Sequence, residues 1–265
     1  NNVLTAFEND YSCGHPYMML LEGSYGSEEN RYTIANNQME FRTDYGSNSY
    51  DFRGILIDNS AYNLDIHNNT MINNSGRNAE YSIRNQGNNN HIYNNTITGK
   101  YSTFIIDVGE NLELNDNIFD SDSHNSIFLY TENAVDFNYH HNNVSSTNAG
   151  AVRLRNESSG NLHNNTFVYE NGDYGLRIES LSDVSVINNI FSGFNIGVDA
   201  QTETIQIFNN NIWGSETPFT GDGLPDLTGL VNTVNANGTP SDVYANIFVD
   251  SEFIDPENNN FNLQL

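Results

Sequence analysis

One short segment recurs along this chain and limits what the chain can fold into. The segment "DIHNNTMINN" at 65–74 has close copies at 91–98, 161–168 and 185–192, each with an asparagine pair next to apolar positions. Aligned on the second residue of the pair, the copies fall 21 to 32 residues apart. These anchors are Asn37, Asn69, Asn95, Asn117, Asn142, Asn165, Asn189 and Asn210. Periods of roughly 20 to 50 residues indicate stacked repeat units.

The residues around each anchor alternate in polarity as a β-strand does. The position three before the anchor and the position two after it are apolar in every copy. This period of two, without an apolar face at helical spacing, predicts strands. A second strand-like run, such as "GILID" at 54–58 or "GLRIE" at 175–179, precedes the anchors by about a dozen residues. The repeat therefore predicts an all-β parallel β-helix, a solenoid of about eight coils.

The asparagine column itself has a structural explanation. Equivalent residues of successive coils stack about 4.8 Å apart, so side-chain amides can hydrogen-bond along the axis as an asparagine ladder. Asparagine also tolerates the left-handed backbone conformation, so we expect the same residue to turn the corner between two sheets. The alternative is recognition of sugar hydroxyls by these side chains. A ladder explains eight identical copies better than a binding site does.

By its repeats, the chain from about 30 to 213 resembles the right-handed parallel β-helix superfamily of pectate-lyase-like proteins. The segment "NIFVDSEFIDPENNNFNLQL" at 246–265 is similar to the end of the β-helix in secreted or cell-surface bacterial proteins. The resemblance implies a right-handed, extracellular or cell-surface protein that acts on polysaccharide, as an acidic-glycan lyase or a glycosidase-like protein. The alternative is a non-catalytic carbohydrate-binding or structural surface module.

The composition changes near Gly214, because four of the five prolines follow it. We expect the coils to occupy 1–213, with a loop insertion near 43–51, and the irregular segment 214–265 to cap the stack. No apolar run approaches the roughly 18 residues of a membrane span, and the chain opens without a signal peptide. We expect a monomer that is a mature portion or a part of a larger chain, with Cys13, its one cysteine, buried and inert.

The charge is strongly negative. Asp and Glu number 34 against 9 Lys and Arg, a formal net charge of −25. Such a surface repels the phosphates of nucleic acids and anionic membranes, so we expect neither as a partner. Against this background, four of the eight arginines fall on one predicted outward face of the second strand runs.

That face combines cations with flat rings. Its predicted outward side chains are Arg84, Arg153, Arg155, Arg177, Phe104, Phe128 and Tyr130. Arginine pairs with carboxylate or sulfate, and aromatic rings stack on sugars, so the face is a candidate groove for an acidic polysaccharide. The alternative is that the arginines neutralise Glu157, Glu179 and Asp199 as cross-strand ion pairs.

The histidines form a second candidate group. His140 and His163 stand two residues before adjacent anchors, with His141 beside the first, and we include His140 and His163 among the substrate-binding candidates. A metal pair or a general base is one interpretation. The spacing matches no metal signature, so ordinary exposed histidines are the simpler one. His67 is at least two coils away.

Catalytic residues follow only from the resemblance, because no catalytic motif is matched. Pectate-lyase-like enzymes use acidic calcium ligands and an arginine base, and polygalacturonase-like enzymes use paired aspartates. By that resemblance Arg153, Arg155 or Arg177 would be the base or neutraliser, Tyr130 the proton donor, and Glu179 the calcium ligand or orienting group. No Asp-Asp pair is present. The cofactor is therefore undefined, with calcium as the candidate.

Overall fold

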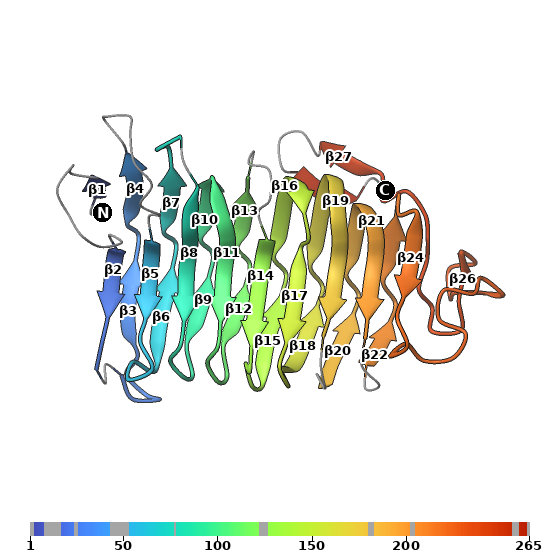
Figure 1. The fold of residues 1–265 in the computed structure, drawn as a ribbon, viewed down its shortest axis with the longest axis horizontal. Helices are drawn as coiled ribbons and strands as arrows, with labels where there is room; N and C mark the ends of the chain where they lie inside the picture. The colour runs from blue at the N-terminus through green and yellow to red at the C-terminus, as the bar shows by residue number, and fades with distance from the viewer. Residues whose placement is uncertain are drawn as a thin grey trace.

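The protein is an elongated solenoid of stacked strands. The computed structural model describes residues 3–7, 17–23, 26–42, 53–76, 78–121, 127–179, 183–201, 205–255 and 260–263. Within these residues all regular structure is β-strand, stacked in chain order along the long axis (Figure 1). The predicted parallel β-helix is confirmed. Cys13 and the predicted loop at 43–51 lie outside the described residues, and the described part contains no helix that could span a membrane.

One face of the solenoid is a sheet of eight parallel strands, which we call the histidine face. Each strand pairs with its counterpart in the next coil, because the anchors keep every coil in register. In chain order the strands are β3 (Tyr32–Ala35), β6 (Leu64–His67), β9 (His91–Tyr93), β12 (Glu113–Asn115), β15 (Phe137–His140), β18 (Ser159–His163), β20 (Asp183–Ile187) and β22 (Ile205–Phe208).

The other two faces belong to one sheet of 16 strands. The face that we call the arginine face contains β2 (Tyr17–Leu21), β5 (Arg53–Ile57), β8 (Ala79–Asn85), β11 (Tyr101–Asp107), β14 (Ile127–Glu132), β17 (Val152–Arg155) and β24 (Thr217–Thr220). The third face contains β1 (Val3–Phe7), β4 (Gln38–Arg42), β7 (Thr70–Asn73), β10 (Thr96–Gly99), β13 (Ile118–Asp120), β16 (Asn143–Ala149) and β23 (Asn211–Trp213). Two long strands, β19 (Thr166–Ile178) and β21 (Ile190–Ala200), run through both faces and join them.

The apolar positions that flank the anchors form continuous columns in the core. The position three before the anchor runs in register from Ile34 to Ile207, and each member is 6% exposed or less. The position two after it runs from Met39 to Ile212 on the third face, equally buried. Both columns predicted from the sequence are confirmed.

The anchor asparagines are buried and hydrogen-bonded to one another. The Nδ2 of Asn117 donates to the Oδ1 of Asn142 at 3.0 Å, and the Nδ2 of Asn142 donates to the Oδ1 of Asn165 at 3.0 Å. The same contact recurs from Asn37 through Asn210, at 3.0 to 3.1 Å. Each acceptor oxygen also binds the backbone N–H of the preceding anchor, so each amide connects two coils twice.

The two residues of each asparagine pair have different roles, which corrects one expectation. The anchor does not turn the corner. The residue before it does, with a positive φ such as 54° at Asn68 and 57° at Asn164. His141 takes this corner position in its coil, with φ 54°. The pair therefore provides one residue for the left-handed turn and one for the hydrogen-bonded column.

Two aromatic residues lie in the core rather than on the surface. Phe104 and Phe128 are 0% exposed, so they cannot stack on a sugar, and their predicted substrate-binding role is wrong. Thr103 pairs with Ile127 and Ile105 with Leu129, but Phe104 and Phe128 are left out of the ladder. The strands bend into the arginine face at this point, so two successive side chains point inward and the alternation of period two fails. The rings join an internal aromatic stack with Tyr101, Phe119, Phe167 and Phe191.

The segment after the last anchor continues the solenoid before it becomes irregular. The strand β24 still pairs in parallel with β21, and the Nδ2 of Asn210 donates to the Oδ1 of Asn246 at 3.1 Å. A hairpin of β25 (Thr233–Val234) and β26 (Pro240–Ser241) extends beyond the last coil (Figure 1). A second pair, β27 (Phe253–Asp255) and β28 (Asn260–Leu263), is also antiparallel.

Candidate functional site

The arginine face carries its polar side chains in two neighbouring rows. One outward row follows the register Arg84, Ile106, Tyr130, Arg153, Arg177 and Asp199. The next outward row contains Glu132 and Arg155, which are partners in the strand register. Arg153 therefore lies beside Tyr130, whereas an alignment of the strand runs on the apolar residues Leu129, Leu154 and Ile178 would place Arg155 there. The alignment failed because Leu154 and Ile178 belong to the column of Thr131, not to that of Leu129.

Each of the three clustered arginines contacts a carboxylate. Arg153 donates from Nε and Nη2 to Glu179 Oε1 at 3.1 and 2.9 Å, and Arg155 Nε lies 2.9 Å from Glu179 Oε2. Arg177 Nε donates to Asp199 Oδ2 at 2.9 Å. Two guanidinium groups thus share one carboxylate, and the third has its own. The structure brings Arg153, Arg155 and Glu179 together as predicted, in the arrangement expected for ion pairs.

Two tyrosines surround these ion pairs. Arg155 Nη1 donates to the hydroxyl of Tyr130 at 3.0 Å, and this bond raises the pKa of the Arg155 guanidinium. A raised pKa disfavours the deprotonated form that a general base requires. Arg177 lies over the ring of Tyr174, with 4.2 Å between its Cζ and the ring centroid. Sequence reasoning missed Tyr174, although it stands three residues before Arg177 in the same strand.

The histidine face holds a longer row of rings. Its outward row follows the register His67, Tyr93, Asn115, His140 and His163. The rings of His140 and His163 stack, with centroids 4.9 Å apart and planes inclined by 11°. His67 stacks on Tyr93 instead, at 4.6 Å. The structure therefore brings His140 and His163 together and keeps His67 apart, as the anchor spacing predicts.

Hydrogen bonds define which ring nitrogen carries the proton in this pair. His140 Nε2 contacts Glu113 Oε1 at 3.2 Å, and His163 Nε2 contacts Asn138 Oδ1 at 3.0 Å. Both partners are acceptors, so each Nε2 carries the proton and a neutral ring leaves its Nδ1 free of one. At the corner, Asn164 Nδ2 donates to His163 Nδ1 at 3.1 Å. The acceptor nitrogens of both rings thus point towards the corner.

His141 meets His140 at that corner. The two Nδ1 atoms are 2.8 Å apart, so they form a hydrogen bond in which one nitrogen carries the proton and the other accepts it. The ring centroid of His141 is 5.0 Å from that of His140 and 6.3 Å from that of His163. Burial, followed by the charges of His140 and His141, lowers the pKa of His163. The neutral form of its imidazole, which is the form that binds metal ions, is therefore favoured.

An acidic row lies beside these rings. Asp65, His91, Glu113 and Asn138 occupy the outward position four before successive anchors. Glu113 Oε2 lies 3.9 Å from His91 Nε2, while its Oε1 contacts His140, so one carboxylate stands between two imidazoles. Sequence reasoning missed this row because it considered only the position two before the anchor. The same period of two would have found it.

A hollow of about 270 Å³ adjoins this acidic row. It is lined by Arg31, Asn89, Asn90, His91, Asn111 and Glu113. Arg31 donates from Nε to Asp65 Oδ1 at 2.5 Å and from Nη2 to the carbonyl oxygen of Asn89 at 2.5 Å. Within the described residues, no three His, Cys, Asp or Glu side chains converge as a complete set of metal ligands. The histidine cluster of His140, His141 and His163 therefore offers a two-nitrogen contact with a third ring nearby.

These faces and columns define the class of protein: a right-handed parallel β-helix repeat protein with polar rows on its outer sheets. Residues 36–224 match the family described as periplasmic copper-binding protein (NosD), and this match covers more than half of the chain. The chain belongs to that family. No curated protein and no solved structure matches it.

Proposed function

We propose that the chain is a non-catalytic β-helix protein of the periplasm or cell surface, and that its histidine cluster binds a copper ion. The observation that supports this proposal is the 2.8 Å between Nδ1 of His140 and Nδ1 of His141. Two nitrogens that bind one metal at about 2.0 Å, at a right angle, are separated by about 2.8 Å. The family description names periplasmic copper-binding proteins, which is consistent with this assignment.

The surroundings of the two rings fit a metal ligand pair. A ligating histidine commonly donates its other ring N–H to a carboxylate or an amide oxygen, as His140 does to Glu113. A cation at the corner would replace the proton that the two Nδ1 atoms share. Imidazole nitrogen suits copper, and divalent copper binds such sites more tightly than the neighbouring metals of its series. His163 is the candidate third ligand, once Asn164 Nδ2 releases its Nδ1.

Copper titration with matched variants tests this proposal. His140→Asn and His141→Asn introduce residue types that other coils carry at the same positions, Asn115 and Asn164, so the coil is retained. The double variant should weaken Cu(II) binding by calorimetry at least about tenfold and remove nitrogen couplings from the Cu(II) EPR spectrum. His67→Asn is the control, because His67 lies in the same row and stacks on Tyr93. Unchanged copper affinity in the double variant, or equal loss in the control, would contradict the proposal.

A second candidate function is binding of an acidic polysaccharide on the arginine face. The specific observation is that the side chains of Arg153, Arg155 and Arg177 remain 29 to 36% exposed although each is ion-paired, with Tyr130 and Tyr174 beside them. A carboxylated glycan would have to exchange with Glu179 or Asp199. A calcium ion at Glu179 would likewise displace two guanidinium groups, which disfavours the calcium proposal.

The arginine-face function is tested by retention on an affinity gel of uronate polysaccharide. Arg153→Ala with Arg177→Ala should abolish most retention, and Arg31→Ala on the histidine face should leave it unchanged. Release of unsaturated or reducing ends by the wild-type protein would indicate that the chain is a lyase or a hydrolase. Arg84, in the same outward row as Tyr130 and Arg153, would then be a further substrate-binding residue. Equal retention by the double variant and the wild type would exclude the arginine face.

A further inference from the structure

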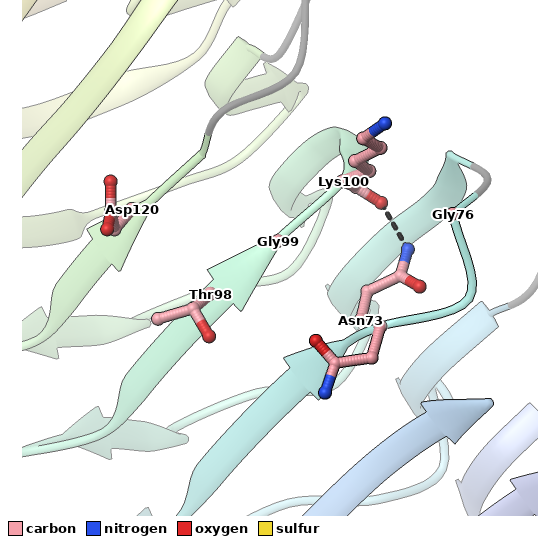
Figure 2. A pocket seen from close by; sticks show the side chains of 7 residues that line it. Asn73, Gly76, Thr98, Gly99, Lys100 and Asp120 are labelled. Carbon is pink, nitrogen blue, oxygen red and sulfur yellow. Dashed lines mark hydrogen bonds between the residues drawn. The ribbon is translucent and has the colours of Figure 1, made fainter.

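A hollow of about 380 Å³ lies at the corner between the third face and the arginine face. It is lined by Asn73, Asn74, Gly76, Thr98, Gly99, Lys100 and Asp120. Its volume is within the range of about 300 to 1,000 Å³ that is common for small-molecule sites. Figure 2 shows Thr98 between Asp120 on one side and Lys100 with Asn73 on the other.

The hollow arises because one coil has a very short corner. In this coil Lys100 alone separates β10 from β11, whereas residues 74–78 separate β7 from β8 in the preceding coil. Gly99 has φ 105°, and a Cβ on it would lie 2.5 Å from the carbonyl oxygen of Asn73. Only glycine fits this turn without displacing the backbone. The side-chain amide of Asn73 donates to the carbonyl oxygen of Lys100, which holds the corner in place (Figure 2).

Lys100 is the only lysine of the chain, and its ammonium group has no carboxylate partner within the described residues. The described arginines differ in this respect. Among the arginines whose side chains the structure describes, all but Arg84 lie within ion-pair distance of Asp or Glu: these are Arg31, Arg53, Arg153, Arg155 and Arg177. In a chain of net charge −25, a lysine without an ion-pair partner among the described residues is a local site for an anion.

The other polar groups of the hollow suit hydroxyl groups. Thr98 pairs in register with Asp120 of the next coil, so the Thr98 hydroxyl and the Asp120 carboxylate stand side by side on the outer surface. Asp120 Oδ1 accepts from Ser145 Oγ at 2.8 Å, which orients the carboxylate. A carboxylate accepts hydrogen bonds from hydroxyls, and a threonine hydroxyl can donate or accept. An anion alone would not use Asp120, whereas a ligand with both a carboxylate and hydroxyls would use every group.

We propose that this hollow binds a small hydroxylated carboxylate with the chemistry of a sugar acid. Lys100 binds the carboxylate of the ligand, and Thr98 and Asp120 bind its hydroxyls. The site lies at the corner that follows the third-face strand, whereas the histidine cluster lies at the corner that precedes that strand. It uses none of the cluster's residues and does not depend on copper binding.

The single lysine makes the test direct. Protein labelled with ¹³C at lysine Cε gives one side-chain methylene signal in an NMR spectrum, and D-glucuronate should shift it in a saturable way. D-glucose, which has the same ring without the carboxylate, should leave the signal in place. Acetate is the anion control. An acetate shift as large as that of glucuronate at equal concentration would overturn the sugar-acid assignment, as would no shift with glucuronate.

A second experiment observes the signals of the ligand and compares variants of the protein. In saturation-transfer difference NMR, Lys100→Gln should weaken glucuronate binding about tenfold or more, because it removes a charge-assisted hydrogen bond. Asp120→Asn should weaken it less. Arg31→Gln is the matched control, because it removes a cation from the histidine face, outside this hollow. Undiminished binding in the Lys100 variant, with its thermal unfolding unchanged, or a loss in the Arg31 variant alone, would overturn the proposal.

Discussion

Asn246 donates its side-chain amide to both carboxylate oxygens of Asp242, at 3.3 and 3.0 Å. This contact ends the column of anchor amides, in which every Nδ2 points towards the next coil. Asp242 is fully buried and also accepts the backbone N–H groups of Gly229, Tyr244 and Asn246, each at 2.9 Å. A carboxylate accepts hydrogen bonds and donates none, so it is a suitable last acceptor for a row of donors.

Replacing Asp242 with Asn should destabilise the C-terminal end of the solenoid. The new amide would turn an NH2 group towards backbone or side-chain donors, and we expect a loss of about 1 to 3 kcal/mol in the free energy of unfolding. Urea denaturation measures it. Asp222→Asn is the control, since Asp222 is exposed. Equal stability of the Asp242 variant and the wild type would show that the carboxylate is dispensable.

Asn142 is the place to test the amide column in the middle of the stack. Its side chain donates to Asn165 Oδ1 and to the carbonyl oxygen of Leu114, and its Oδ1 accepts from Asn117. Asn142→Ala leaves these buried groups without partners and should cost about 1 to 3 kcal/mol or more. Asn161→Ala, on the exposed surface of the histidine face, is the control and should cost little. Similar losses in both variants, measured by thermal unfolding, would mean that the column contributes nothing specific.

Asp107 should make stability depend on pH. It is buried against Tyr139, and burial raises its pKa to about 6 from 3.8. The folded state therefore binds this proton more tightly than the unfolded state does, so the contribution is complete below pH 3.8 and is lost as the pH rises through 6. Asp107→Asn cannot ionise, so the variant does not lose this stability as the pH rises. Its register partner in the preceding coil, Asn85, is already an asparagine.

The measurement is the difference in unfolding free energy between Asp107→Asn and the wild type, from urea titrations at pH 4 to 8. This difference should move in favour of the variant by about 2 kcal/mol between pH 4 and pH 7 and then level off. Taking the difference cancels the titration of the other carboxylates. A difference that does not change with pH, or one that moves in favour of the wild type, would contradict the raised pKa of Asp107.

Added salt should stabilise the protein. The excess of 34 acidic over 9 basic residues creates self-repulsion in the folded state, and salt screens it. We expect the melting temperature to rise between 10 mM and 1 M NaCl. Sucrose, which stabilises without screening charge, serves as a comparison. A melting temperature that stays flat across this range would remove repulsion as a factor in the stability of this chain.

Sequence periodicity alone was sufficient to predict which side chains face the core in the straight strands of each coil. The anchor at Asn142 and its apolar neighbours Tyr139 and Val144 follow from a period of two in straight strands, where one residue type must recur in every coil to face the same interior. His140 and His163 were placed together for the same reason, because equal offsets from successive anchors stack directly above one another.

Only the tertiary structure decided what lies at the corners and which residues of neighbouring coils meet. Phe104 points inward because the strand bends there, and bending breaks the alternation that the sequence displays. Arg153 lies beside Tyr130, and Asp242 meets Asn246, through registers and turns that vary from coil to coil. Alternation depends on backbone geometry within one strand and can be seen in the sequence. Contacts across coils depend on how many residues each corner takes up, which only the folded chain defines.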